Sequence, residues 1–159
     1  MPRKKRSKIC YEPAPDLQMK SDEISRILFP HVRISNVKCL RSFGSASRGT
    51  IARCHTIGKV MQMAMGTPAW YAIEFISERF DKMSEEDQIK TIIHELMHIP
   101  KTFGGGFQHH DFVCEENVDK MYRIFMREKS GGNSSKDIFS EEVSGEKETN
   151  WKNLFNGKR

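Results

Sequence analysis

Two histidines and a glutamate stand close together in the pentapeptide His94-Glu95-Leu96-Met97-His98, which has the pattern H-E-x-x-H. On an α-helix, residues four positions apart lie about 40° apart around the axis and about 6 Å apart along it, so both imidazoles can reach one metal ion. Glu95 lies about 100° from His94 around the same axis, where its carboxylate can reach a water beside the ion. The spacing predicts that His94 and His98 are metal ligands and that Glu95 is catalytic.

A third ligand has to come from outside this helix, because a catalytic zinc usually has three protein ligands and one open position. Pro100 ends the helix, and the glycines at 104–106 allow the chain to turn sharply. His109 and His110 follow that turn directly. His110 is the preferred third ligand and His109 is the alternative, so we expect one Zn²⁺ per chain.

Other third ligands follow from the known classes of H-E-x-x-H site. The extended metzincin pattern needs glycine and histidine where this chain has Lys101 and Gly104, so that subclass is excluded. The gluzincin pattern takes a glutamate from the next helix, which Glu115 or Glu116 could supply. Spacing alone does not decide among these residues.

The chemistry that these residues could perform is peptide-bond hydrolysis. Zinc lowers the pKa of a bound water from 15.7 towards roughly 7, and Glu95 would take its proton as the water attacks a peptide carbonyl. Tyr71 or Tyr122 could stabilise the oxyanion, and the sequence does not choose between them. The chain is therefore predicted to be a zinc metalloendopeptidase that acts on a protein or peptide.

The helix that carries the motif has clear boundaries in the sequence. Ser84 is a typical N-cap, and three acidic residues follow it in the first turn, where negative charge stabilises the helix dipole. The helix is predicted to run to about His98. Four apolar residues fall at helical spacing on one face and predict burial against a sheet: Ile89, Ile92, Ile93 and Leu96.

The remaining elements predict an α+β fold. Alternating or apolar segments predict strands over 32–40, 50–57, 59–64 and 70–76. Helical spacing predicts helices over 20–29 and 112–127. We expect a small, mainly antiparallel sheet packed on the metal-binding helix, with a second helix after it. The methionines at 61, 63 and 65 are then expected to pack in the core.

The 159 residues predict one domain with two tails. Residues 1–16 form a basic, proline-containing arm, residues 17–127 the metallopeptidase domain, and residues 128–159 a disordered tail with an apolar cluster at Trp151–Phe155. The net charge of +5 comes from the arm, since residues 9–159 hold 21 basic and 21 acidic residues. The arm could make weak contacts with nucleic acid.

The compartment is predicted from cysteine usage and hydropathy. The four cysteines Cys10, Cys39, Cys54 and Cys114 form no C-x-x-C pair and are expected to be reduced, mostly buried thiols. No segment has the length of apolar sequence that a membrane span needs, and the first residues lack the apolar run of a signal peptide. These features predict a cytoplasmic protein with no membrane contact.

The segment HELMHIPKTFGGGFQHH resembles a family of metallopeptidases found in archaea and phages, which is similar to the SprT-like zincins. Further upstream, Arg41–Gly44, Ala52–His55 and Phe80–Ser84 also look like this family, so the resemblance covers about residues 10–127. It implies a zincin-like α+β domain in which the sheet lies over the metal-binding helix and its edge strand aligns the substrate. It also implies His94, His98 and His110 as zinc ligands and Glu95 as the catalytic glutamate.

A second function class stays open at this point. The same residues could form a catalytically inactive, zinc-stabilised module that binds nucleic acid or a protein partner. A third hypothesis combines peptide hydrolysis with nucleic-acid binding. SprT-like proteins are associated with proteolysis of DNA-bound proteins, and the basic arm could hold such a protease on DNA.

Overall fold

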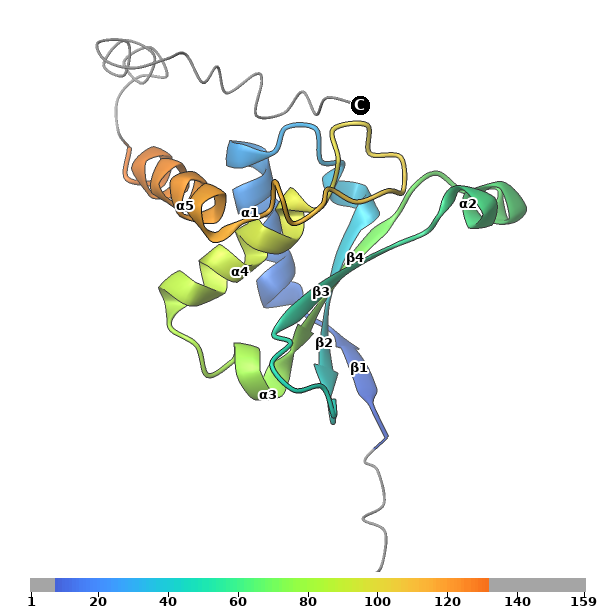
Figure 1. Ribbon diagram of the computed structural model, residues 1–159, viewed down its shortest axis with the longest axis horizontal. Coiled ribbons are helices and arrows are strands. Elements are labelled where there is room, and N and C mark those ends of the chain that lie inside the picture. Colours follow the sequence, from blue (N-terminus) through green and yellow to red (C-terminus); the bar gives the residue numbers. More distant parts are fainter. Residues whose placement is uncertain (1–7, 132–159) are drawn as a thin grey trace, which may run out of the picture.

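Residues 8–131 are described by the computed structural model, and they form a four-stranded sheet with helices packed against it (Figure 1). The strands are β1 (Cys10–Pro13), β2 (Val37–Phe43), β3 (Ala52–Thr56) and β4 (Tyr71–Ile76). The helices of this part of the chain are α1 (Pro15–Leu28), α2 (Lys59–Met65), α3 (Ser77–Phe80), α4 (Glu85–Met97) and α5 (Glu115–Lys129), and a 3₁₀ turn at Ile34–Asn36 precedes β2. The predicted α+β class is confirmed.

The sheet is mixed, whereas the sequence predicted a mainly antiparallel one. Its strand order is β1-β2-β4-β3, and the two outer pairs are antiparallel. The central pair β2–β4 is parallel, in register from Val37 opposite Tyr71 to Ser42 opposite Ile76. The chain reverses once between β2 and β3 and again around α2, so β4 returns in the direction of β2 and inserts between β2 and β3. This order leaves β3 at one edge of the sheet.

The core lies between the sheet and three helices. Helix α1 packs against β2, α4 packs against β3, and α5 packs against both of these helices (Figure 1). The predicted apolar stripe of α4 is buried, and it meets the alternate β4 residues Ile73 and Phe75, which are also fully buried. The predicted cap of α4 is present, because the Ser84 hydroxyl accepts from the Asp87 N–H at 3.1 Å. The motif helix is thus fixed against the sheet.

The segment predicted as a strand over 59–64 is a helix, so that prediction was wrong. Methionine, glutamine, lysine and alanine are all good helix formers, and no neighbouring strand offers them a ladder. Gly66 ends α2 in the left-handed conformation, with φ of 60°. The expected core packing of the methionines was wrong too, since Met61, Met63 and Met65 are 52 %, 85 % and 60 % exposed.

Several element boundaries differ from the sequence prediction. Helix α1 begins at Pro15, because proline at the first helical position lacks only an N–H that would be unpaired there. Strand β1 falls inside the segment predicted as the basic arm, and β2 begins only at Val37, after the 3₁₀ turn. Helix α5 occupies most of the predicted 112–127 helix and extends to Lys129.

Parts of the predicted tails lie outside the described residues. These are residues 1–7, with most of the basic charge, and residues 132–159, with Trp151–Phe155. The cysteines are free thiols, as predicted, but only Cys39 is fully buried and Cys10 is exposed. Within residues 8–131, none of the helices has both the length and the apolar character needed to cross a bilayer.

Candidate metal centre

Three histidine side chains meet at the C-terminal end of α4. One ligand atom from each of His94, His98 and His110 lies within 4.8 Å of the other two. The Nε2 atoms of His94 and His98 are 3.3 Å apart. Nitrogen ligands about 2.0–2.1 Å from a tetrahedral zinc are separated by about 3.3–3.4 Å. The separation of this pair and the all-imidazole donor set suit a divalent metal ion.

The ring of His98 is oriented by the backbone of Gln108. The Nδ1–H of His98 donates to the Gln108 carbonyl at 2.8 Å, which leaves Nε2 as the nitrogen with the free lone pair. The Gln108 N–H in turn donates to the His98 carbonyl at 2.7 Å. These two bonds close the loop that follows α4 and bring His110 back beside the helix end.

The glycine turn within this loop is fastened to strand β4. The buried Tyr71 hydroxyl accepts from the Gly105 N–H at 3.0 Å and donates to the Gly106 carbonyl at 2.9 Å. Gly105 has a φ of 92°, which side chains other than glycine rarely adopt. The Tyr71 ring also packs edge-on against Phe103. The turn that presents His110 is therefore held by the sheet.

Burial changes the proton affinity of the imidazoles. Burial, followed by the charges of His98 and His110, lowers the pKa of His94 to about 4. Burial also lowers the pKa of His98, although its bond to Gln108 opposes this shift. Both rings are then neutral at neutral pH, which is the form that binds a metal.

Glu95 is buried, with 6 % of its surface exposed, although it stands between the two motif histidines in sequence. Burial raises the pKa of Glu95 to about 7, and a hydrogen bond from the backbone of Cys54 on β3 acts in the opposite direction. Without a metal ion, the protonated carboxyl is therefore more favoured in this site than in water. A group with such a pKa can both accept and return a proton.

The sequence that forms this site matches a known protein family. A family model described as "Putative phage metallopeptidase" matches residues 9–137. The chain belongs to this family. The match confirms the family resemblance drawn from the sequence, and it includes every residue of the histidine cluster. No curated protein and no solved structure matches the chain.

In this member of the family, the other predicted ligands lie outside the cluster. His109 is exposed, and its imidazole does not join the group that the described residues form. Glu115 and Glu116 are exposed at the start of α5 and do not join it either. The histidine that the fold brings to the cluster is His110.

Tyr122, the other tyrosine considered for the oxyanion, lies on α5 under the ammonium group of Lys90, which is 5.1 Å from its ring centroid. Tyr71 uses its hydroxyl on the glycine turn. The structure thus gives Tyr71 a positioning role that sequence reasoning missed.

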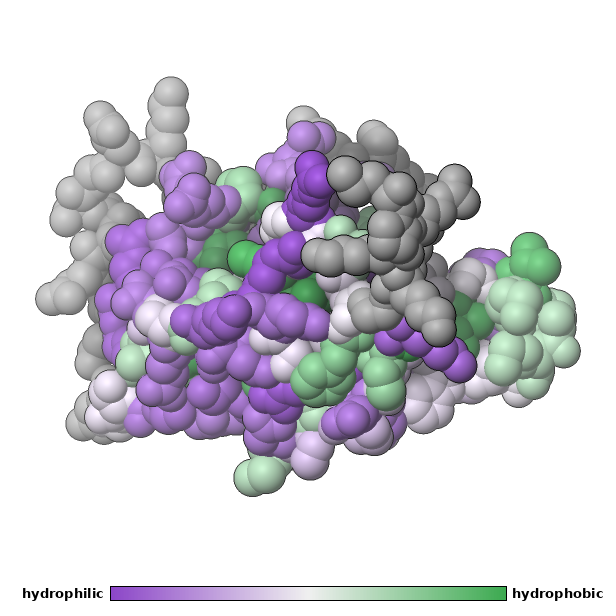
Figure 2. All heavy atoms as spheres, turned by 90° about the horizontal axis from the view of Figure 1, so that it is seen from below, coloured by the Kyte–Doolittle hydropathy of each residue, from purple (hydrophilic) through white to green (hydrophobic). Residues whose placement is uncertain are grey.

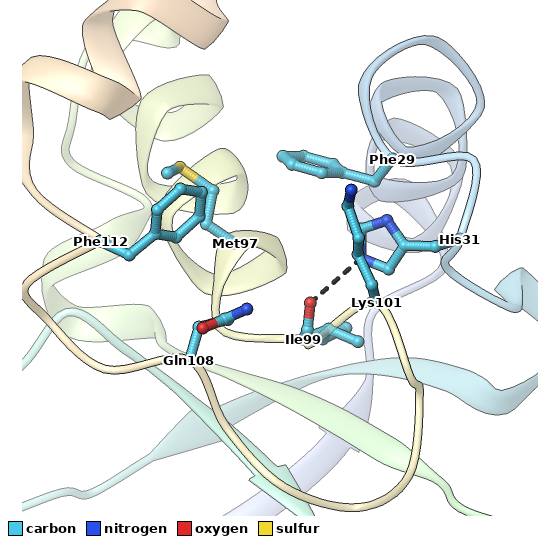
Figure 3. A pocket seen from close by; sticks show the side chains of 7 residues that line it. All are labelled: Phe29, His31, Met97, Ile99, Lys101, Gln108 and Phe112. Carbon is cyan, nitrogen blue, oxygen red and sulfur yellow. Dashed lines mark hydrogen bonds between the residues drawn. The ribbon is translucent and has the colours of Figure 1, made fainter. Parts of the chain in front are cut away.

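A small pocket lies behind the helix end (Figure 3). Its walls come from Phe29, Met97 and Phe112, and the His31 Nε2–H donates to the Ile99 carbonyl at 3.1 Å across its floor. The space admits about one water molecule, which is too little for a substrate side chain. The pocket supports the loop from α4 rather than enlarging the metal centre.

Sequence reasoning missed three residues that hold the histidine cluster and Glu95 in place, namely Gln108, Cys54 and Gln62. Gln108 and Cys54 act through backbone atoms, which every residue type carries. Gln62 acts through its amide, which donates to Ile57 and Gly104 carbonyls from another part of the chain. The sequence holds no signal for such contacts.

Proposed function

We propose that this member of the phage metallopeptidase family is a zinc-dependent endopeptidase in which His94, His98 and His110 hold the ion and Glu95 is the general base. The observation that carries the proposal is that three imidazole nitrogens lie within 4.8 Å of one another. Two of these imidazoles belong to the helix that also carries the buried Glu95. The 3.3 Å separation of two of these nitrogens supports zinc.

Bound zinc would supply Lewis-acid chemistry, which lowers the pKa of water and polarises a peptide carbonyl. Glu95 accepts the proton of the attacking water and passes it to the leaving amine. Burial raises the pKa of this carboxyl above its ordinary value, which favours a group that can both accept and return a proton. Gln108 keeps His98 in the tautomer that such a site requires.

The edge of β3 that faces away from β4 pairs with no other strand among residues 8–131, and it is suited to align a peptide backbone. Two residues that flank β3 pair with the β4 segment. The Ile57 N–H donates to the Trp70 carbonyl, and the Ile51 carbonyl accepts from the Ile76 N–H. Since antiparallel pairs bond at every second residue, the backbone groups of Ala52, Cys54 and Thr56 point away from β4. The backbone of Cys54 donates a hydrogen bond to the Glu95 carboxyl. A substrate strand added along β3 would therefore pass beside the general base.

Metal content tests the ligand set. Mass spectrometry of protein purified without a histidine tag should find about one zinc ion per chain, because one set of three histidine ligands binds one ion. His94→Ala, His98→Ala and His110→Ala should each lose the ion, and the matched variant His109→Ala should keep it. Retention of zinc by His110→Ala together with its loss in His109→Ala would assign the third ligand to His109 instead.

Turnover tests the catalytic role. Glu95→Gln should keep the zinc and lose at least about 10²-fold in the rate of peptide hydrolysis, because the general base is gone. Equal rates for the parent and Glu95→Gln would overturn the mechanism. A parent that binds zinc and cleaves no peptide would instead favour the zinc-stabilised binding module.

A further inference from the structure

Helix α2 presents an exposed apolar surface and contacts the loop that leads to His110. Four of its seven residues are large and apolar with at least half of their surface exposed: Val60 82 %, Met61 52 %, Met63 85 % and Met65 60 %. No residue of α2 is buried. The helix projects from the end of the sheet, and its side chains form a hydrophobic lobe in the space-filling view (Figures 1 and 2). We refer to residues 57–69 as the α2 arm.

Nothing among residues 8–131 covers these side chains. The apolar side chains of α2 add nothing to the core, and an apolar patch left in water usually marks a binding surface. Methionine side chains are flexible and polarisable, so a surface made from them can fit many different apolar partners. The composition of the arm thus favours binding that tolerates sequence variation.

The arm is fixed to the loop that carries His110. The Gln62 amide donates to the Gly104 carbonyl at 3.0 Å and to the Ile57 carbonyl at 2.7 Å. At the other end of the arm, the Trp70 indole N–H donates to Thr67 Oγ1 at 3.0 Å. The apolar surface therefore stays in one position relative to the metal centre.

The arm also continues the edge of β3. The strand ends at Thr56 and α2 begins at Lys59, so only two residues separate the free edge from the apolar surface. A polypeptide that added to β3 would run onto the arm without turning. Lys59 is the only charged residue from 57 to 73. The arm therefore has no cluster of charges that would attract an acidic or a basic partner.

We propose that the α2 arm is a substrate-binding surface that takes the apolar side chains of an extended polypeptide lying along β3. This selects unfolded chains rich in aliphatic and aromatic residues over polar ones. The inference rests on the proposed function, since it assigns the substrate class of that same site.

The experiment measures binding with Glu95→Gln protein, so that no peptide is consumed. The probe is a fluorescein-labelled peptide of about 14 residues, which spans about 45 Å when extended and can cover both β3 and the arm. It carries leucine and phenylalanine in one half, and a matched peptide carries serine and threonine there. Anisotropy titrations compare the parent background with V60Q/M63Q, and with Met19→Gln, a control at a methionine that is 75 % exposed on α1.

V60Q/M63Q should weaken binding of the apolar peptide by about 5- to 20-fold, since two large apolar contacts are lost. The polar peptide should bind more weakly than the apolar one and should respond little to either change. Met19→Gln should bind like the parent. Melting temperatures should agree among the three proteins, because the substituted side chains contact solvent.

The outcomes separate this inference from the proposed function. If the active protein cleaves peptides but V60Q/M63Q binds and cleaves the apolar peptide like the parent, the inference is overturned and the endopeptidase stands. If no peptide is cleaved yet V60Q/M63Q still loses apolar binding, the arm is a polypeptide-binding surface and the enzyme proposal fails. Two further assays cover the other occupants. If V60Q/M63Q loses only binding to phosphatidylcholine vesicles, the inference is overturned in favour of lipid. If V60Q/M63Q loses only self-association in sedimentation, it is overturned in favour of a second copy of the chain.

Discussion

Gln108 is tied twice to His98 through its backbone, with its N–H on the His98 carbonyl and its own carbonyl on the His98 Nδ1–H. One bond closes the loop after α4, and the other fixes which ring nitrogen faces the cluster. His110, two residues further on, is thereby returned to the end of the helix that carries His94. The histidine cluster depends on the loop from His98 to His110 as much as on the H-E-x-x-H helix.

Gly105→Ala should damage this loop. A Cβ at position 105 would overlap the Gln62 amide and lie 2.5 Å from the Ile57 carbonyl oxygen, and the φ of 92° is unfavourable for alanine. We expect a loss of about 2–4 kcal/mol in the free energy of unfolding and weaker zinc binding. Thermal unfolding and metal titration measure both.

The matched control for that change is Gly106→Ala. A Cβ at Gly106 meets nothing within 4 Å, and its backbone is not in the left-handed region. It should change the free energy of unfolding by less than about 0.5 kcal/mol. Similar losses in the two variants would contradict a specific requirement for glycine at 105.

Tyr71→Phe separates positioning from oxyanion stabilisation. Removal of the hydroxyl leaves the Gly105 N–H and the Gly106 carbonyl without their partner, which should cost about 1–3 kcal/mol in stability and weaken zinc affinity. At saturating zinc, kcat should fall less than about tenfold. A fall of about 10²–10³ with zinc affinity intact would instead identify Tyr71 as an oxyanion donor. Tyr122→Phe is the control and should alter neither quantity.

Glu95 should make the stability of the metal-free protein fall as pH rises. Its pKa is about 7 in the folded state because of burial, against an ordinary value of 4.5. Folding therefore favours the protonated carboxyl, and the penalty grows from about pH 4.5 and is complete above pH 7. Glu95→Gln should remove it and raise the free energy of unfolding at pH 8 by about 2–3 kcal/mol.

Urea unfolding of chelator-treated protein at pH 5 and pH 8 measures this effect. The difference between Glu95→Gln and the parent should be small at pH 5 and large at pH 8. Glu116→Gln, an exposed carboxylate on α5, should follow the parent at both pH values. A constant difference across this range would show that Glu95 does not titrate within it.

Glu74, buried on β4, should show the opposite pH dependence. Burial by itself would raise its pKa, but the nearby Ser42 hydroxyl, the hydrogen bond to His55 and the charge of Arg53 outweigh that effect and leave the pKa below its ordinary value. The ionised form therefore stabilises the fold above about pH 4.5, and this contribution is lost as pH falls through the lowered pKa. Glu74→Gln should cost about 1–2 kcal/mol at pH 7.

Unfolding measured at pH 7 and pH 3 tests the role of Glu74. The cost of Glu74→Gln should shrink at pH 3, because the lower pH shifts the parent carboxyl toward its protonated form. His55→Ala should reproduce part of the loss at pH 7, because His55 Nε2 lies 2.8 Å from the Glu74 carboxylate. A cost for Glu74→Gln that is the same at both pH values would assign the effect to packing rather than to charge.

The sequence by itself determined the parts of this protein that depend on neighbours along the chain. The cap at Ser84, the buried apolar stripe and the i, i+4 histidines all lie within one helix, whose regular period converts spacing into direction. The α+β class and the family could be predicted for the same reason, since they rest on local patterns. The tail assignments stay predictions.

Only the tertiary structure decided which distant groups meet. The sequence placed two candidate histidines after the glycines, and the loop closed by Gln108 brings the imidazole of His110 to the cluster. The parallel β2–β4 pair, the pKa of Glu95 and the exposed α2 arm likewise depend on long-range packing. The alternation of the methionines suggested a strand, but these residue types are good helix formers, and residues 59–65 have no pairing partner among the described strands and form a helix.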